Sequence, residues 1–230
     1  MGNSRTAEEL LRDNIAVLGE ELGNVYHHLW QELAWLYSKW NEYVELFGTK
    51  ESRLELINSA SPRFFKIVQD SLWEDVILHI ARMTDPPKSV GKKNLTVKAL
   101  PQLVNDRDLK EELQTLIETS VKKTEFCRDW RNRRIAHKDL ALVIEERIKP
   151  LKPATRAKVK EALSSLVLIL NTISRHYMDS ETKFDMGFSN VGGAVSLLYV
   201  IDDGLKAQKE REVRLRSGNF DKSDFQARDL

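Results

Sequence analysis

Apolar residues in the first part of the chain recur at steps of three and four, the period of a helix with one buried face. The series consists of Leu11, Ile15, Leu18, Leu22, Val25, Leu29, Leu33, Leu36, Trp40, Tyr43 and Phe47. It predicts one long amphipathic helix that ends before Gly48, because glycine often follows the last residue of a helix. We expect this helix to be the spine of the fold.

Start and stop signals predict more helices along the chain. Ser61 followed by Pro62 is typical of a helix start, and Asp85-Pro86-Pro87 ends that helix near Thr84. A shorter helix is expected near residues 51–58. Capping residues predict three others: a short one after Thr96, a long one from Asp106 or Asp108, and one from Thr155 to about Asp179. A last helix is expected from Val191 to about Arg216.

No segment alternates apolar and polar residues with the period of a strand. The expected fold class is therefore all-α, a bundle of long antiparallel helices with an extra C-terminal helix. Residues 1–216 are predicted to form a single helical domain. Residues 217–230 are polar with few aliphatic side chains, and we expect a flexible tail there.

Composition limits the class of protein. The chain has 230 residues, enough to bury a core, and its one cysteine excludes a disulfide framework and fits a reducing compartment. We expect no signal peptide, and the uncharged stretch from Ala162 to Ser174 is too short to span a bilayer. We expect a cytoplasmic protein without a membrane partner.

The formal net charge of +1 conceals a basic region. Residues 122–160 contain thirteen Lys and Arg against five Asp and Glu, a net charge of +8, so the remainder of the chain carries −7. Clustered cations attract a nucleic-acid backbone because binding releases counterions. The alternative is an ordinary solvated face on charge-rich helices.

Inside this region the chain reads Arg-Asn-Arg-Arg-Ile-Ala-His-Lys-Asp from Arg131 to Asp139. Arginine offers a rigid fork of donors that fits a phosphate, and histidine exchanges a proton near neutral pH. Those two groups suffice to cut RNA without a metal. The alternative is a basic helix end whose cations face the negative pole of the helix dipole.

On a straight helix Arg131 would extend a buried stripe. The stripe consists of Leu113, Leu116, Ser120, Thr124 and Cys127. A buried guanidinium needs a partner, either a carboxylate of the preceding long helix, Asp75 or Asp85, or an RNA phosphate in a cleft. His137 would lie about 120° around that helix and about 9 Å along it from Arg131. A long Arg side chain, unwinding near Ala136 or supply of the two groups by different subunits would close this gap.

Two motifs resemble a known family. The five residues between Arg131 and His137 match the Arg-x(4–6)-His motif of the HEPN superfamily of small all-helical ribonucleases. Upstream, residues 72–85 end in Ala-Arg-Met-Thr-Asp, and a polar loop leads to Asn94-Leu95-Thr96. This order resembles the abortive-infection HEPN family of the AbiU type, over about Thr6 to Val200.

The resemblance implies an HEPN-like bundle that acts as a metal-independent endoribonuclease in anti-phage abortive infection or in a toxin–antitoxin pair. The alternative is an inactive HEPN module that binds a partner protein, a nucleotide or RNA. Expected partners are RNA, a second copy of the chain and an antitoxin or regulatory protein. The assigned residues are catalytic Arg131, His137 and Asn132; RNA-binding Arg128, Arg133, Arg134 and Lys138; and site-supporting Asp75, Arg82, Asp85 and Asp139.

Other chemistry is less well supported, and we expect no cofactor and no metal. His79 follows Asp75 by one helical turn, a pair that could bind a metal, but the Glu-x-x-His units of di-metal bundles are missing. Cys127 is interpreted as a small buried hydrophobe rather than a nucleophile. Gly192-Gly193 lacks the lysine and the strand of a phosphate loop.

Overall fold

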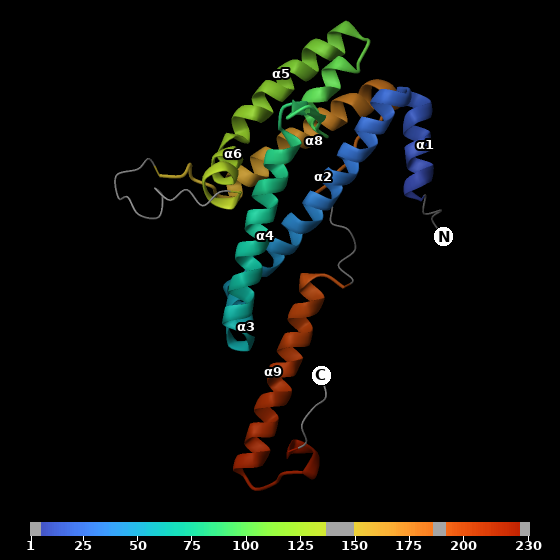
Figure 1. Cartoon of the computed structure of the whole chain (residues 1–230). Helices are drawn as coiled ribbons and strands as arrows, with labels where there is room; N and C mark the ends of the chain where they lie inside the picture. The colour runs from blue at the N-terminus through green and yellow to red at the C-terminus, as the bar shows by residue number, and fades with distance from the viewer. Residues whose placement is uncertain (1–5, 137–149, 186–191, 226–230) are drawn as a thin grey trace. The chain divides into compact units, whose positions relative to one another are not determined.

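Figure 1 shows the computed structural model, which describes residues 6–136, 150–185 and 192–225. Within these ranges helices account for nearly all regular structure, beside one small hairpin, so the all-α prediction is confirmed. The chain divides into two compact units, residues 1–40 with 72–187 and residues 41–71 with 188–230. Each unit is described by itself. The single domain predicted for residues 1–216 stays a prediction.

The first predicted helix is two helices, so that expectation was wrong. Helix α1 covers Ala7–Leu18, α2 covers Glu20–Phe47, and Gly19 between them has φ of +83°, a conformation that favours glycine. A Cβ at Gly23 would lie 2.7 Å from the Cα of Ile15, so the two helices approach too closely for a larger residue. The break left no mark on the apolar period because only one residue separates the helices.

Other helix boundaries follow the predicted signals. Helix α3 covers Glu51–Ala60 and α4 covers Pro62–Met83. After α4, strands β1 (Lys88–Ser89) and β2 (Lys92–Lys93) pair antiparallel, a small hairpin that the sequence pattern does not predict. Val90 and Gly91 join them, both with positive φ as in a type I′ turn. Two-residue strands are too short to produce an alternating pattern.

The remaining helices of the first unit follow the hairpin. The 3₁₀ helix η1 covers Val97–Gln102, α5 covers Arg107–Lys123, α6 covers Glu125–Trp130 and α8 covers Arg156–Met178. Side-chain oxygens of Thr96, Asp106 and Thr155 accept backbone N–H groups at three of these starts, as the sequence predicts.

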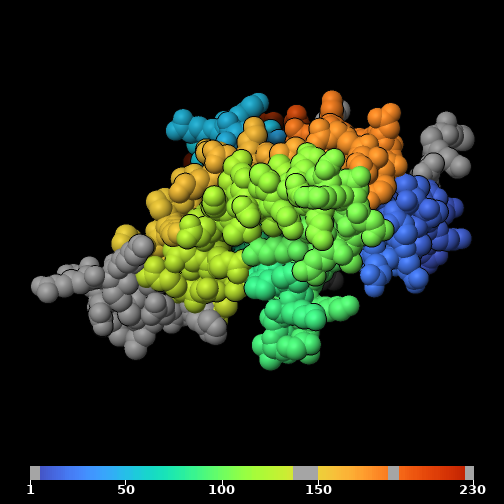
Figure 2. Space-filling view, turned by 90° about the horizontal axis from the view of Figure 1, so that it is seen from above, coloured from blue at the N-terminus to red at the C-terminus, as the bar shows by residue number. Residues whose placement is uncertain are grey.

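Helices α5 and α8 run side by side in opposite directions (Figure 1). The hydroxyls of Ser120 on α5 and Ser165 on α8 lie 2.9 Å apart in their buried contact. The largest fully buried aliphatic side chains of this unit come from α2, α4, η1, α5 and α8: Leu29, Leu33, Leu36, Ile77, Ile80, Leu100, Leu113, Leu163, Leu166, Ile169 and Leu170. Figure 2 shows the face that carries α5, with the residues of the hairpin projecting from it.

The second unit is built from chain segments far apart in the sequence. Its core joins Leu46, Ile57 and Phe65 with Ala194 and Leu198 of helix α9, which covers Ala194–Arg216. The Glu42 carboxylate accepts the N–H of Ala194 at 2.5 Å, at the start of α9. Beyond α9, the 3₁₀ helix η3 covers Lys222–Phe225, and Asp224 accepts a 2.8 Å hydrogen bond from Arg214. The predicted tail therefore contacts α9 as far as it is described.

Candidate active site

The helix expected to carry the Arg/His motif is not one straight α-helix, and that expectation was wrong. Helix α5 ends at Lys123, where the Thr124 hydroxyl donates back to the Ser120 carbonyl at 2.9 Å. The short α6 follows, and η2, Arg131–Ile135, is a π-helical turn. Its marker is the N–H of Ala136, which donates to the Arg131 carbonyl, five residues back, at 2.8 Å. Such turns widen a helix and occur often at functional sites.

Arg131 contacts a carboxylate rather than continuing into the core. Its Nη1 lies 2.6 and 2.7 Å from the two oxygens of Asp85, and its Nε donates to the Asn132 amide oxygen at 3.0 Å. Arg128 donates to the same Asp85 carboxylate at 3.2 Å and to the Thr84 carbonyl at 2.8 Å. Of the two carboxylates considered for Arg131, the partner is Asp85 and not Asp75. The Arg131 side chain keeps 25% of its surface exposed.

The two motifs that suggested a family meet at this ion pair. The Thr96 hydroxyl lies 2.8 Å from the Asp85 carbonyl and 3.0 Å from the Met83 carbonyl, so the end of the hairpin loop is fastened to the end of α4. The hydroxyl oxygens of Thr124 and Thr84 lie 3.3 Å apart. These contacts hold the Asp85 backbone against α6 and fix the position from which its carboxylate reaches Arg131.

Several other cations of the basic region also have carboxylate partners. Arg133 lies 3.5 Å from Asp129, and Arg134 lies 3.3 Å from Glu74 with its guanidinium carbon 5.2 Å from the centre of the Trp130 ring. Arg134 remains half exposed. RNA binding by Arg128, Arg133 and Arg134 stays a prediction. His137, Lys138 and Asp139 lie outside the described residues.

The backbone of Lys152 contacts α6, the helix directly before Arg131. The Trp130 indole donates to the Lys152 carbonyl at 2.8 Å, and the Lys152 N–H donates to Asp129 at 2.8 Å. Trp130 also packs edge to face on Trp73, with ring centres 6.4 Å apart. Sequence reasoning missed these contacts, although a tryptophan directly before the Arg/His motif was a signal that something packs there.

A second polar cluster lies between α2 and α4. The Lys39 ammonium donates to Asp75 at 2.5 Å and lies 3.0 Å from Nδ1 of the buried His79. Lys39 therefore contacts both Asp75 and His79, the two residues considered as a metal-binding pair. Burial, together with the positive charges of Lys39 and Arg82, lowers the pKa of His79 to about 4, although Glu32 and Asp75 act in the opposite direction. His79 is thus neutral at pH 7.

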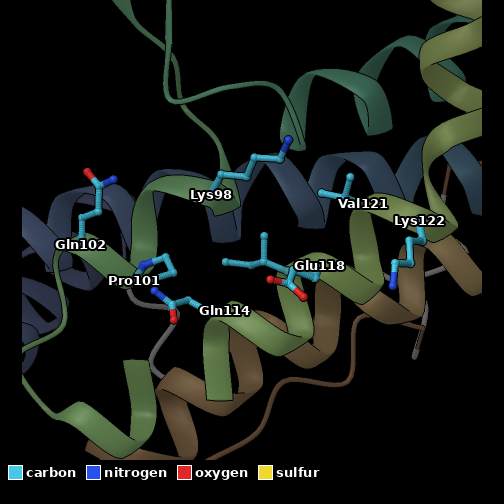
Figure 3. Close-up of a pocket in the computed structure, with 8 residues that line it drawn as sticks. Lys98, Pro101, Gln102, Gln114, Glu118, Val121 and Lys122 are labelled. Carbon is cyan, nitrogen blue, oxygen red and sulfur yellow. The ribbon is translucent and has the colours of Figure 1, made fainter. Parts of the chain in front are cut away.

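Hollows on the described part of this unit include two that bear on the site. One, of about 360 Å³, is lined by Leu29, Glu32, His79, Arg82, Met83, Asp85, Asn94 and Leu95, and so includes the partner of Arg131. The other, of about 730 Å³, lies between η1 and α5 (Figure 3). Its described lining contains lysines, glutamines and Glu118 but no histidine. The smaller hollow is the one that contains both a histidine and the carboxylate bound to Arg131.

The family model of AbiU2, an HEPN family, matches residues 19–195, which include both motifs and every residue of the Asp85 ion pair. The chain belongs to the AbiU2 family. The resemblance inferred from the two motifs is confirmed, and the chain is an HEPN module of the abortive-infection type. No curated protein and no solved structure matches it.

Other features of this AbiU2 protein bear on the remaining expectations. In the described ranges, no helix is long and apolar enough to cross a membrane. Over the same residues, no three His, Cys, Asp or Glu side chains form a group that could hold a metal ion. Cys127 is fully buried, and burial raises the pKa of its thiol, which agrees with a packing role.

Proposed function

We propose that this AbiU2 protein is a metal-independent endoribonuclease that acts in anti-phage abortive infection or in a toxin–antitoxin pair. The observation that carries the proposal is the arrangement of Arg131. Its guanidinium is oriented by Asp85 and Asn132, remains partly exposed, and stands at the start of a π-helical turn. In the sequence that turn leads directly to His137, the residue of the family motif that exchanges protons.

The chemistry follows from the two side chains. In the proposed reaction His137 takes the proton of a ribose 2′-hydroxyl as its oxygen forms a bond to the adjacent phosphorus. The bond from phosphorus to the 5′-oxygen breaks, the 5′-oxygen takes up a proton, and a 2′,3′-cyclic phosphate remains. Arg131 stabilises the negative charge that grows on the phosphoryl oxygens, and Asn132 holds its Nε in place.

Arg131 can bind a phosphate through its Nη2 or by exchanging the Asp85 carboxylate for it. One guanidinium nitrogen bonds the Asp85 carboxylate, and Nη2 has no hydrogen-bond partner among the residues that the structure describes. Arg128 donates to the same carboxylate, so Asp85 keeps a cation when Arg131 turns to a phosphate. Asp85 is thereby a positioning residue, and it also limits binding of RNA until a phosphate competes for Arg131.

The proposal includes a homodimer whose two-fold axis brings two copies of the motif together. Two basic regions would then face one RNA, and the His137 of one copy could act beside the Arg131 of the other. An antitoxin or regulatory protein is the expected partner that restrains the activity. Light scattering at micromolar concentration should give the mass of a dimer; a monomer that still cleaves RNA would contradict this part of the proposal.

An inactive module that binds a partner is the second candidate, and one observation favours it. Arg131 already has the Asp85 carboxylate, which is the contact expected if the arginine is only structural. Under this alternative RNA cleavage is absent, and Arg131 and His137 serve the fold or a binding surface.

A cleavage assay with a chelator present tests the proposal. We expect the wild-type protein to cleave single-stranded RNA into products with 2′,3′-cyclic ends, and His137→Ala to be slower by a factor of about 10² to 10⁴. The matched control is Arg107→Ala, which removes an exposed arginine that pairs with Glu111 at the start of α5. Cleavage that is equal in wild type and His137→Ala would contradict the assignment of His137.

A further inference from the structure

The smaller hollow has a wall of unusual composition. Its polar residues are Glu32, His79, Arg82 and Asp85, and its apolar residues are Leu29, Met83 and Leu95, with Asn94 at the end of the hairpin loop. We call it the His79 pocket. Because Asp85 belongs both to this lining and to the ion pair with Arg131, the pocket lies directly beside the proposed phosphate position.

His79 offers a fixed hydrogen-bond donor there. Its Nδ1 faces the Lys39 ammonium, which has no lone pair, so Nδ1 accepts and the ring proton is on Nε2. His79 is buried to 99%, yet Nε2 has no hydrogen-bond partner among the described residues. Glu32 lies 2.7 Å from that nitrogen without the alignment of a hydrogen bond. An unsatisfied buried donor is costly, and such groups are often completed by a ligand.

Electrostatics restricts what the pocket can hold. A phosphate would meet the carboxylates of Glu32 and Asp85, and a metal cation would meet Arg82 and the Lys39 ammonium next to His79. A neutral, flat molecule with both a donor and an acceptor on one edge avoids both conflicts. The aliphatic walls at Leu29, Met83 and Leu95 suit such a molecule, because base faces pack on apolar side chains.

Guanine matches this arrangement of polar groups. Its O6 accepts the Nε2–H of His79, and its adjacent N1–H and 2-amino group donate to the two oxygens of the Glu32 carboxylate. The other bases offer one ring or amino donor beside one acceptor on that edge, and so would use only part of the carboxylate. Glu32 is half exposed, which leaves an open side for entry of a base.

We propose that the His79 pocket binds an unpaired guanine of the RNA substrate, next to the phosphate that Arg131 holds. This inference rests on the proposed ribonuclease function and names its sequence preference. Glu32 and His79 are specificity-determining residues, while Lys39 and Asp75 are positioning residues that set the tautomer of His79.

Calorimetric titration of the His137→Ala protein with nucleoside monophosphates tests the pocket without any cleavage. We expect guanosine monophosphate to bind about 10-fold more tightly than inosine monophosphate, which lacks the 2-amino group, and than adenosine or cytidine monophosphate. Glu32→Gln should weaken binding of guanosine monophosphate about 10-fold or more. The matched control is Glu118→Gln, which changes a carboxylate in the larger hollow (Figure 3). Thermal melts confirm that both variants fold.

Equal affinity for the four nucleotides, equal effects of Glu32→Gln and Glu118→Gln, or no binding at millimolar concentration would each overturn the pocket assignment. These outcomes are separate from those of the cleavage assay. If RNA is cleaved without a guanine preference at or beside the cut, the ribonuclease proposal stands and the pocket assignment fails. If guanosine monophosphate binds as described and no RNA is cleaved, the pocket assignment stands and the ribonuclease proposal fails.

Discussion

Two charged clusters on or just beyond helix α4 differ in their balance of charge. At Asp85 one carboxylate serves two guanidinium groups, those of Arg128 and Arg131, so a cation is in excess. At His79 the cations Lys39 and Arg82 are matched by the carboxylates of Asp75 and Glu32 around a neutral imidazole, so the charges balance. Neighbouring clusters with different charge can therefore bind different parts of one substrate. The first cluster suits a phosphate and the second suits the donors of a base.

The largest expected effect is a difference in RNA cleavage rate between variants of the two arginines that contact Asp85. Arg131→Ala should slow RNA cleavage about 10² to 10³-fold, the usual cost of removing a donor to a developing charge. Unfolding should become easier by only about 1 to 2 kcal/mol, less than for a stranded charge, because Arg128 stays on Asp85. Arg128→Ala is the control, with a similar loss of stability and less than a 10-fold loss of rate. The two are compared by single-turnover kinetics and urea unfolding; equal rates for both variants would remove the distinction.

The next effect concerns pH and the His79 cluster. The unfolded histidine binds a proton below about pH 6.5, whereas in the fold its pKa is about 4, so between these values the unfolded state binds more protons and stability falls with falling pH. Lowering the pH from 7 to 4.5 should cost about 2 to 3 kcal/mol through this group.

Urea unfolding at both pH values, for wild type and His79→Phe, isolates that contribution. The free energy of unfolding of wild type minus that of His79→Phe should be larger at pH 7 than at pH 4.5. A smaller slope will remain in the variant, because burial, followed by the charge of His28, lowers the pKa of His27 as well. Parallel pH dependences in the two proteins would contradict a neutral, buried His79.

A third change weakens the contrast between the clusters by removing one charge. Asp85→Asn leaves two guanidinium groups around a neutral amide, so the free energy of unfolding should fall by about 1 to 2 kcal/mol. Non-specific RNA affinity should rise several-fold, because Arg131 no longer exchanges a carboxylate for a phosphate. Filter binding with the His137→Ala background prevents cleavage during the measurement. Weaker RNA binding by Asp85→Asn would mean that the carboxylate orients Arg131 and does not compete with RNA.

The smallest expected effect lies at the edge of the basic region. Arg134 is half exposed and paired with Glu74, so Arg134→Ala should reduce the slope of log affinity against log salt by about one unit. Arg133, which is 21% exposed beside Asp129, should change the slope less. A flat salt dependence in the wild type would identify the basic region as a solvated face.

Sequence reasoning succeeded where structure is decided locally. The starts of α4 at Pro62, η1 after Thr96 and α8 after Thr155 depend on a proline or a capping hydroxyl, and each is legible in a few residues. The break at Gly19 and the π-helical turn at Arg131 were not predicted from the sequence. Both depend on contacts with other helices, which a periodic pattern does not record.

The residues of the candidate site could be predicted from the sequence, but the sequence did not show which of them form ion pairs with one another. Asp75 and Asp85 were equal candidates for Arg131 because both belong to the same stretch of sequence. The choice follows from geometry, since Thr96 fastens the backbone of Asp85 beyond the helix end, while Asp75 is taken by Lys39. The contact between Lys39 and His79 joins residues 40 positions apart and has no local signal.

The hydrogen bond between Glu42 and Ala194 also affects when the second unit can fold during translation. The core of the second unit needs Ala194 and Leu198, yet Leu46, Ile57 and Phe65 are translated long before them. At roughly 5 to 20 residues per second, several seconds pass between synthesis of Phe65 and of α9. During that interval these apolar side chains lack their final cover on the nascent chain, so this unit is completed only after α9 has been translated.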